Sequence, residues 1–424
     1  MRVEIIGAGI VGVTTAYELS ALGHEVTVLD RRGSVAEEAS FANAGVIAPG
    51  YVTPWAAPGM PFKVLSHLLS RHAPVRLGGP AGLGALTHLP WMWRWWRACR
   101  PAVYAANRAA MHRLAHFSRE RLLELTRTLH LDYEQNPGYL VLLRSERDFR
   151  AAQGGLTLLR ELGVAHELVD AIRARQIEPG LRTSTALHAA IHLPQDGVGN
   201  CRHFAHLLKA EAQRLGASFR FDTDVRSLTP GGKPVVHTTR GDRRETDAVV
   251  VCAGVQANAL LSSIGCRLPL APVHGYSITA PLRHLDSQPD LGPRAALMDE
   301  RFKVAITRLG QRVRVAGSAE LGGPLERMTP AALRTLYKVL DDWFPGATLP
   351  RESQEWKGAR AMLPDGPPVL GESGAPGIWL NLGHGSSGWA LACGSARVLA
   401  ERISGREAPL DASRLTLARL RGQA

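Results

Sequence analysis

Short apolar runs broken by glycine turns dominate the first thirty residues. Residues 2–6 predict a buried strand, residues 9–22 have the spacing of a helix, and residues 25–29 predict a second strand. Strand, helix and strand in this order form a parallel βαβ unit. The pattern returns in a helix expected over residues 201–215 and an apolar strand within residues 246–254. The chain therefore predicts a doubly wound α/β domain assembled from separated segments.

Between those segments the pattern changes. Residues 139–144 predict a buried strand, and three later stretches alternate as strands of a second sheet, at 273–280, 303–308 and 312–317. Helices are expected over residues 62–72, 90–129, 146–163, 171–177 and 330–343. These elements predict a sheet that lies outside the nucleotide fold and carries its own helices.

The turn after the first strand carries a dinucleotide-binding fingerprint. Gly7 permits a tight turn, Gly9 lets the backbone approach a pyrophosphate at the helix N-terminus, and Gly12 brings the helix close to the strand. Asp30 closes the second strand and suits a hydrogen bond from a ribose hydroxyl. A glycine turn that serves packing alone would leave Asp30 unexplained, so the pattern predicts a bound dinucleotide.

A second glycine-rich turn favours one dinucleotide over another. The strand expected at residues 377–382 leads through residues 383–388 into a helix that ends near residue 404. A helix N-terminus carries about half a positive charge, which suits a reduced flavin because that group is anionic on its pyrimidine side. A nicotinamide enzyme does not need this turn. The pattern favours FAD over NAD, and a turn needed only for packing is the alternative.

The expected fold class is α/β: a Rossmann-like FAD-binding domain with an inserted α+β substrate domain built on a mixed or antiparallel sheet. The FAD-binding domain is discontinuous in sequence, and the substrate domain fills the gaps between its segments. The expected boundaries are residues 1–60, 195–265 and 355–424 for the FAD-binding domain and residues 61–194 and 266–354 for the substrate-binding domain.

Charge and cysteine content exclude several classes of protein. The formal charge is +12, but the arginines are spread along the chain with no basic block. A solvated surface explains this best, anionic lipid comes second, and no nucleic acid is expected. The five cysteines contain no CxxC pair, so neither a disulfide framework nor a metal site is indicated. With no apolar stretch of about 18 residues and no room for a signal peptide before the first strand, we expect a cytoplasmic protein.

One segment leaves the membrane open as a partner. Residues 91–97 place four tryptophans and two arginines on one expected helix. Helical spacing puts Trp91 and Trp95 on one face with Met92, Trp96 and Cys99 beside them, and Arg94, Arg97 and Arg100 opposite. A core helix with solvated arginines is the favoured interpretation. A helix at the inner face of the cell membrane, in peripheral contact with anionic lipid, is the alternative.

Several motifs together resemble the small subunit of bacterial D-amino acid dehydrogenases, within the wider group of D-amino acid oxidase, glycine oxidase and sarcosine oxidase flavoproteins. They are the glycine fingerprint and residues 40–47, 49–51, 54–59, 275–277, 303–308 and 382–389, of which Pro-Trp-Ala-Ala-Pro-Gly at 54–59 is the most specific. The resemblance covers essentially the whole chain. It implies non-covalent FAD, oxidation of a small D-amino acid or D-imino acid to the imine and then to the 2-oxo acid plus ammonia, and a respiratory-chain or quinone electron acceptor.

The resemblance also supplies the main candidate for substrate binding. The family motif Gly-Leu-Arg-Pro-Met-Thr-Pro-Asp-Gly corresponds to residues 358–366, with Ala361 in place of the proline and Leu363 in place of the threonine. In the wider group its arginine clamps the substrate carboxylate, which implies that role for Arg360. A planar guanidinium suits the task because it donates two parallel hydrogen bonds. The two departures affect the shape of this edge, and a surface ion pair is the alternative for Arg360.

Three further side chains are candidates for catalysis. A phenol from Tyr276 or Tyr51 is expected to assist with the carboxylate, and His384 to bond the amine or the flavin edge; burial or a turn role is the alternative for each. The expected flavin contacts are Gly7, Gly9, Ile10, Val11, Gly12, Asp30, Arg31, Ser40, Asn43, Ala44, Gly45, Val225, Ala253, Gly254, Arg360, Gly383, His384, Gly385, Ser386, Ser387 and Gly388.

Other functions stay open at this point. Relatives that oxidise D-proline or cis-4-hydroxy-D-proline fit the same motifs, as does an oxygen-using oxidase of amino acids or N-methyl amino acids, which would produce hydrogen peroxide. A different class is a non-catalytic FAD-binding subunit, which substrate would leave unbleached. A flavin domain that acts on modified RNA is disfavoured, because no basic block with interleaved aromatics occurs.

Overall fold

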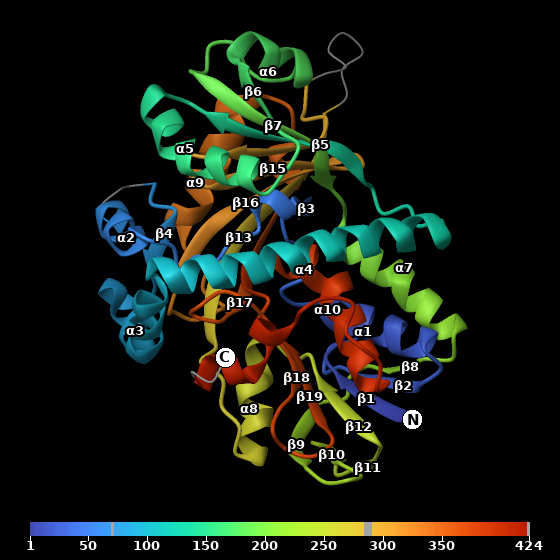
Figure 1. The fold of residues 1–424 in the computed structure, drawn as a ribbon. Helices are drawn as coiled ribbons and strands as arrows, with labels where there is room; N and C mark the ends of the chain where they lie inside the picture. The colour runs from blue at the N-terminus through green and yellow to red at the C-terminus, as the bar shows by residue number, and fades with distance from the viewer. Residues whose placement is uncertain (69–71, 284–290, 422–424) are drawn as a thin grey trace.

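The computed structural model describes residues 1–68, 72–283 and 291–421, and it contains two large sheets (Figure 1). The first sheet is six-stranded, with β12 (Ala248–Val251), β1 (Arg2–Ile6), β2 (Glu25–Leu29) and their neighbour β19 (Ile378–Leu382) all parallel. Its edges are β8 (Ser218–Arg220), which is parallel to β2, and β18 (Val369–Glu372), which is antiparallel to β19. The predicted parallel nucleotide sheet, assembled from separated segments, is confirmed.

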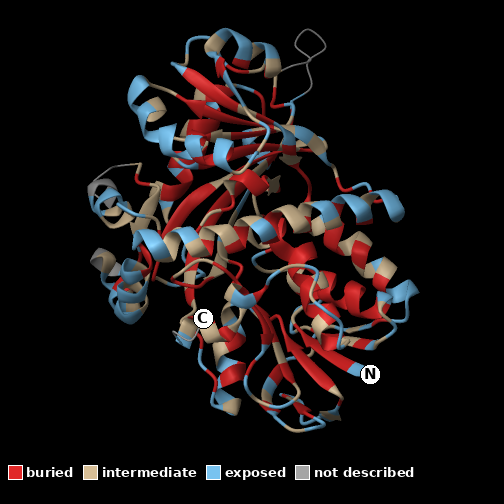
Figure 2. Cartoon of the chain, viewed as in Figure 1, coloured by how far each residue is buried: buried red, intermediate tan, exposed pale blue. Residues whose placement is uncertain are grey.

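Helices and a small sheet bury this first sheet on both faces. Val3, Ile5 and Val250 pack under four helices, α1 (Ile10–Ala21), α4 (Pro101–Thr128), α7 (Cys201–Arg214) and α10 (Gly388–Ile403). Ile6 and Val251 face the opposite layer, formed by β9 (Val225–Thr229), β10 (Val235–Thr238), β11 (Arg243–Glu245) and α8 (Ala257–Leu261). Burial on both faces explains why β12 is a continuous apolar run and why β1 has only one polar residue, Glu4, between its apolar positions 3, 5 and 6 (Figure 2).

The second sheet is mixed and ten-stranded. Its main path runs in the order β17 (Gln354–Met362), β13 (Ala271–Pro281), β16 (Arg312–Leu321), β15 (Val304–Leu309), β14 (Ala296–Asp299), β5 (Asn136–Leu143), β7 (Ala189–Val198) and β3 (Val46–Ile47). Two short strands join it beside this path, β4 (Val75–Leu77) and β6 (Glu167–Asp170). The β14–β5 and β16–β4 pairs are parallel, whereas the other pairs are antiparallel. α9 (Pro330–Trp343) packs on one face, with Leu336 and Trp343 fully buried.

The pairing of strands places two segments in the ten-stranded sheet. β17 and β3 hydrogen-bond into the ten-stranded sheet, although the boundaries at residues 60 and 355 assign both to the FAD-binding domain. α4 lies across the middle of the molecule, between the two sheets, and packs against α10 (Figure 1). The division into two domains stays a proposal, with the sheet boundary after β17 rather than before it.

The helix expected over residues 90–129 is two helices. α3 (Leu89–Ala98) ends before Pro101, and α4 begins there, because proline suits a first helical turn but disrupts a helix interior. α2 (Met60–Leu68) begins two residues before the expected helix, whose residues 69–71 lie outside the described part of the chain. The other expected helices are present within a few residues, as α5 (Glu146–Glu161), α6 (Ala171–Ile177), α7, α9 and α10.

Candidate active site

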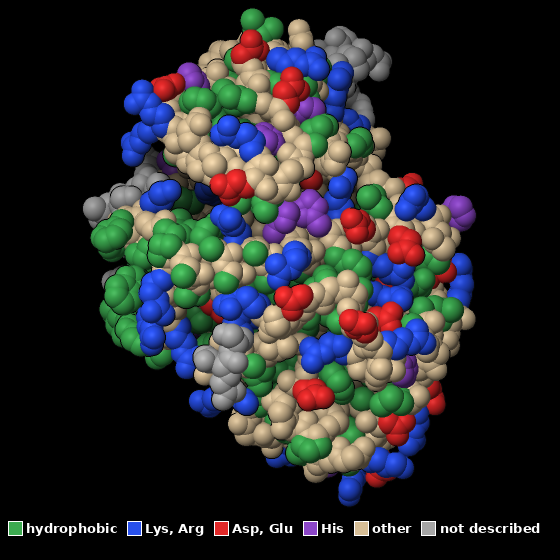
Figure 3. Space-filling view, viewed as in Figure 1, with side chains coloured by type: hydrophobic (Ala, Val, Ile, Leu, Met, Phe, Trp, Pro, Cys, Tyr) green, Lys and Arg blue, Asp and Glu red, His purple; other side chains and the backbone are tan. Residues whose placement is uncertain are grey.

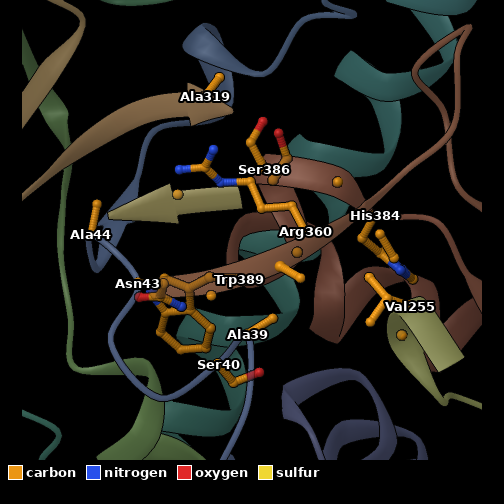
Figure 4. A pocket seen from close by; sticks show the side chains of 18 of the residues that line it. Ala39, Ser40, Asn43, Ala44, Val255, Ala319, Arg360, His384, Ser386 and Trp389 are labelled. Atoms are coloured by element: carbon orange, nitrogen blue, oxygen red, sulfur yellow. The ribbon is translucent and has the colours of Figure 1, made fainter. Parts of the chain in front are cut away.

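One large cavity lies between the two sheets and collects nearly all of the expected site residues. Its volume is about 1370 Å³, whereas small-molecule pockets usually hold roughly 300–1,000 Å³. It extends from the turn after β1, past the loop at residues 37–57, to β13, β17 and the turn at residues 383–388. All of the expected contacts line it except Gly12, which packs against the Gly7 carbonyl. Figure 4 labels several of these lining residues, among them Ser40, Asn43 and His384.

The glycine fingerprint has the geometry that a dinucleotide needs. Gly7 has a φ of +106°, and a Cβ there would lie 2.6 Å from the Cys252 carbonyl oxygen. A Cβ on Gly12 would lie 2.9 Å from the Gly7 carbonyl carbon, so only glycine lets α1 approach β1 this closely. The N–H of Ile10, at the start of α1, donates to Ser40 Oγ at 3.1 Å and marks the end of the helix where a pyrophosphate would bind.

Asp30 and its neighbours form the wall at the ribose end. Its Oδ2 accepts from Ala8 N at 2.5 Å and its Oδ1 from Arg32 N at 2.8 Å. Burial raises the pKa of Asp30 and these backbone hydrogen bonds oppose the shift. Arg31 and Arg32 both pair with Glu38. The carboxylate is therefore fixed at the edge of the cavity, which fits a ribose hydroxyl as donor.

The second glycine turn closes the cavity at the N-terminus of α10. Gly383 and Gly385 have φ values of +80° and +56°, so the turn needs residues without a side chain. Asn43 Oδ1 accepts from Gly45 N at 2.8 Å, and Trp389 Nε1 donates to Gly45 O at 3.2 Å. These bonds hold the loop of residues 43–45 against α10. Two helix N-termini and a long cavity between them fit FAD, as predicted.

Arg360 projects from β17 into the cavity (Figure 4). Its Nη1 donates to Ser318 O at 3.1 Å. Among the described residues no carboxylate lies within ion-pair distance of it. Burial lowers the pKa of Arg360 to about 10, so it remains protonated at neutral pH. An uncompensated guanidinium in a cavity is a site for an anion.

The three other catalytic candidates line the same cavity but are held by protein partners. The Tyr276 hydroxyl donates to Glu320 Oε2 at 2.7 Å, and the Tyr51 hydroxyl donates to Glu300 Oε2 at 2.9 Å. His384 Nε2 lies 2.9 Å from Ser395 Oγ on α10, and burial lowers the pKa of His384 to about 3. These contacts favour positioning roles, and substrate contact by any of the three stays a prediction.

Several residues of the cavity were not among the candidates. Trp55 Nε1 donates to Ser386 Oγ at 3.1 Å, and the Trp356 ring stacks near Phe41 at 6.4 Å between centroids. Glu300 pairs with Lys303 near the cavity wall. Trp356 lies two residues before the family arginine motif, so proximity to Arg360 in sequence was the one available signal. In the part of the chain that the structure describes, no group of three or more metal-ligating side chains occurs.

A single space thus joins the dinucleotide fingerprint to an arginine that has no carboxylate partner within the described ranges. A redox cofactor and an anionic substrate can share it, which is the arrangement of a flavin-dependent oxidoreductase. Residues 2–402 match the family model described as "DAO: FAD dependent oxidoreductase". D-amino acid dehydrogenase of Cereibacter sphaeroides is 43% identical over 99% of this chain and 95% of its own length, and that of Sinorhizobium medicae is 41% identical over 99% and 100%.

The chain belongs to the D-amino acid dehydrogenase family of FAD-dependent oxidoreductases. Solved structures agree on the fold. Glycine oxidase from Geobacillus kaustophilus has a TM-score of 0.75 at 19% identity, covering 99% of both chains. L-proline dehydrogenase from P. horikoshii has a TM-score of 0.73 at 19% identity, covering 100% of this chain and 98% of that one. The expected family, fold class and FAD cofactor are confirmed.

Proposed function

We propose that the protein oxidises a small D-amino acid or D-imino acid to the imine, which water converts to the 2-oxo acid and, for a primary amine, ammonia. The observation that carries this proposal is Arg360, a protonated guanidinium in the cavity with no carboxylate partner among the described residues. A substrate carboxylate supplies the missing charge. The names of the close relatives support the D configuration.

The residues of this chain bind and orient more than they transfer protons. Arg360 grips the carboxylate with two hydrogen bonds, which fixes the α-carbon relative to the rest of the cavity. Gly7, Gly9, Asp30 and residues 383–388 would hold FAD, which supplies the hydride acceptor when it is bound. With its pKa near 3, the His384 imidazole is neutral at pH 7. It therefore does not compete with Arg360 for the substrate carboxylate.

An anaerobic titration tests the proposal. FAD-loaded protein is mixed with D-alanine, L-alanine, D-proline, cis-4-hydroxy-D-proline and sarcosine, and the flavin absorbance is followed. Bleaching by the D-amino or D-imino acids, but not by L-alanine, is the expected result. If none of them bleaches the flavin, the protein is a silent FAD-binding subunit and the proposal fails. Steady peroxide production in air would assign it instead to the oxygen-using oxidases.

Arg360→Lys tests the site itself. Lysine keeps the charge but lacks the two-pronged geometry, so KM for a D-amino acid should rise at least tenfold while FAD stays bound. Arg360→Ala should raise it further. Unchanged KM values in both variants would remove Arg360 from the substrate site.

We propose further that a quinone accepts the electrons and that the protein meets it at an anionic membrane. The support is an apolar face on α2, the 3₁₀ segment Pro80–His88 and α3, formed by seven side chains that are each 54–77% exposed: Phe62, Leu65, Leu83, Leu86, Leu89, Trp93 and Trp96. Figure 3 shows apolar side chains gathered over α2 and α3 with basic side chains beside them. The surrounding cations suit acidic headgroups.

This apolar face borders the active-site cavity. On α2, Met60 and Val64 line the cavity while Phe62 and Leu65 face outward. A quinone dissolved in lipid would therefore reach the cavity at its α2 edge. No helix of the described residues has the length and apolar composition needed to span a bilayer, so contact through this face would be peripheral.

α3 has features of both a core helix and a membrane-facing helix. Trp91 and Met92 pack against Val273 and Met362, and Trp95 packs beside Cys99, as expected of a core helix. Trp96, expected beside that inward face, is 59% exposed, and Trp93 is 55% exposed with Arg97 over its ring at 4.7 Å. The helix is long enough to present both a packed and an exposed side.

Co-sedimentation with phosphatidylglycerol vesicles at low salt tests the surface. The Trp93→Glu/Trp96→Glu variant should bind at least fivefold less than the unaltered protein, and Ile172→Glu, a change at an exposed apolar residue on α6, should bind normally. Failure of the unaltered protein to bind, or equal loss in the α6 control, would refute the membrane proposal without affecting Arg360.

A further inference from the structure

Two glycines face each other across the sheet beneath Arg360. Gly275 on β13 and Gly358 on β17 are register partners. Neither has the left-handed backbone that would by itself require glycine. Both line the cavity. Glycine at these two positions therefore leaves room for neighbouring side chains and is not required by the backbone conformation.

Two side chains of β17 occupy that space. A Cβ on Gly275 would lie 2.5 Å from Cζ of Arg360, and a Cβ on Gly358 would lie 2.5 Å from Cζ3 of Trp356. Separations under 3.0 Å are not seen for real Cβ atoms. The Arg360 side chain thus crosses β13 at Gly275 to reach Ser318 O on β16, and the indole of Trp356 lies over Gly358.

The residues next to this glycine pair are held by a buried acid. Tyr276 and Lys357 are the next register partners and are both buried. Glu320 on β16 accepts from the Tyr276 hydroxyl at 2.7 Å and from Lys357 Nζ at 3.0 Å. Ser318, whose carbonyl receives Arg360, has a φ of +61°. A rigid floor of this kind keeps Arg360 and Trp356 in one place.

We propose that Gly275 and Gly358 are positioning residues: by lacking side chains, they let Arg360 and Trp356 lie where the two can hold the substrate. Arg360 receives the carboxylate, and Trp356 forms an uncharged flat wall for the substrate side chain, which selects small apolar amino acids. This inference rests on the proposed function of Arg360. Trp356 is the specificity-determining residue of the pair, because its ring, backed by Phe41, bounds the space next to the guanidinium.

Gly275→Ala is the first test, made on the FAD-loaded protein. The added methyl displaces the guanidinium, so KM for D-alanine should rise at least tenfold while kcat changes less than threefold. The Kd for benzoate, a carboxylate without an amine, should rise in parallel when it is read from the flavin spectrum. A merely structural role would lower FAD content and kcat together. Gly155→Ala, on an exposed turn of α5 with open space around it, is the control and should match the unaltered protein.

A double variant separates this inference from the proposed function. In an Arg360→Ala background there is nothing to displace, so adding Gly275→Ala should change KM and benzoate binding less than twofold. Additive effects, or Gly275→Ala with normal KM, would overturn the positioning role. If Gly275→Ala does not fold, recovery of FAD content in the double variant supports the steric conflict, and no recovery refutes it. An unaffected Arg360→Ala would instead refute the proposed function.

Trp356→Leu tests the wall. Removing the indole enlarges the space over Gly358, so the ratio of kcat/KM for D-phenylalanine to that for D-alanine should rise at least fivefold. The Kd for benzoate should change less than the D-phenylalanine KM because Arg360 is intact. An unchanged ratio would remove Trp356 from substrate selection and leave the positioning role of Gly275 to its own test.

Discussion

Replacing Glu320 by glutamine should destabilise the ten-stranded sheet, because it leaves the buried Lys357 without its anionic partner. The Glu320 and Lys357 side chains are 4% and 2% exposed and lie 3.0 Å apart. The second carboxylate oxygen accepts from Tyr276 and from Thr329, both at 2.7 Å. Glutamine has only one carbonyl oxygen to accept from these donors. Its NH₂ group would face the remaining donors and cannot accept a hydrogen bond from them. Lys357 would then keep its charge with only the Pro324 and Arg327 carbonyls as acceptors.

The loss of folding stability expected for Glu320→Gln follows from two independent quantities. Burial raises the pKa of Glu320, but hydrogen bonds from its neighbours, with Tyr276, Thr329 and Lys357 among them, outweigh burial and bring the pKa down from 4.5 to about 2. At roughly 1.4 kcal/mol per tenfold change, this corresponds to about 3 kcal/mol of folding stability. Removing one partner of a buried ion pair costs roughly 3–5 kcal/mol. We therefore expect Glu320→Gln to lower the free energy of unfolding by about 3 kcal/mol at pH 7.

The pH dependence gives the sharper readout. Because the pKa of Glu320 is lower in the folded state, its contribution is complete well above pH 4.5 and is lost as the pH falls toward 2. The gap between the unaltered protein and Glu320→Gln should shrink by about 0.8 kcal/mol between pH 7 and pH 4. Urea unfolding of the FAD-loaded proteins, followed by circular dichroism, measures the gap, with exposed Glu352→Gln as control. A gap under 1 kcal/mol, or one that widens in acid, would refute the reasoning.

Three other variants report on the cavity. Gly12→Ala should fold with at least tenfold weaker FAD binding by flavin fluorescence titration, since its methyl would press α1 away from the Gly7 carbonyl; normal affinity would contradict this. Tyr51→Phe should change KM less than threefold, because the hydroxyl is already bound to Glu300, whereas a tenfold rise would make it a substrate ligand. His384→Asn should leave the shape of the kcat/KM profile between pH 5 and 8 unchanged, because burial holds the pKa of His384 near 3; a lost inflection would show that it titrates.

Local sequence patterns were sufficient to predict the parallel nucleotide-binding sheet. The strand at residues 2–6, the turn at Gly7 and the acid at Asp30 act within thirty residues of one another, so spacing alone predicted their arrangement. The helix at 330–343 was predicted at its observed bounds for the same reason, because its apolar face repeats at helical spacing.

Non-local packing explains what the sequence did not predict. β17 contains Gly358, which is buried beneath a neighbouring side chain, so the strand lacks a clear alternation of apolar and polar residues. β7 contains Pro194 and Gly197, which read as turn residues. The partners of Tyr276 and Tyr51 are Glu320 and Glu300, and nothing in the local pattern pairs either tyrosine with its acid.

Which of the chain's positive charges face the cavity is decided by the fold and does not follow from the net charge. The formal charge of +12 gave no specific prediction, because the arginines are spread along the chain and many pair with carboxylates, as Arg31 does with Glu38. Among the positive groups at the cavity, the informative ones are the N-termini of α1 and α10 and the guanidinium of Arg360. A pyrophosphate, a reduced flavin and a carboxylate are all anionic, and each suits one of these three positions. We therefore expect anion binding in this cavity to depend on these three positive groups more than on the excess of surface charge.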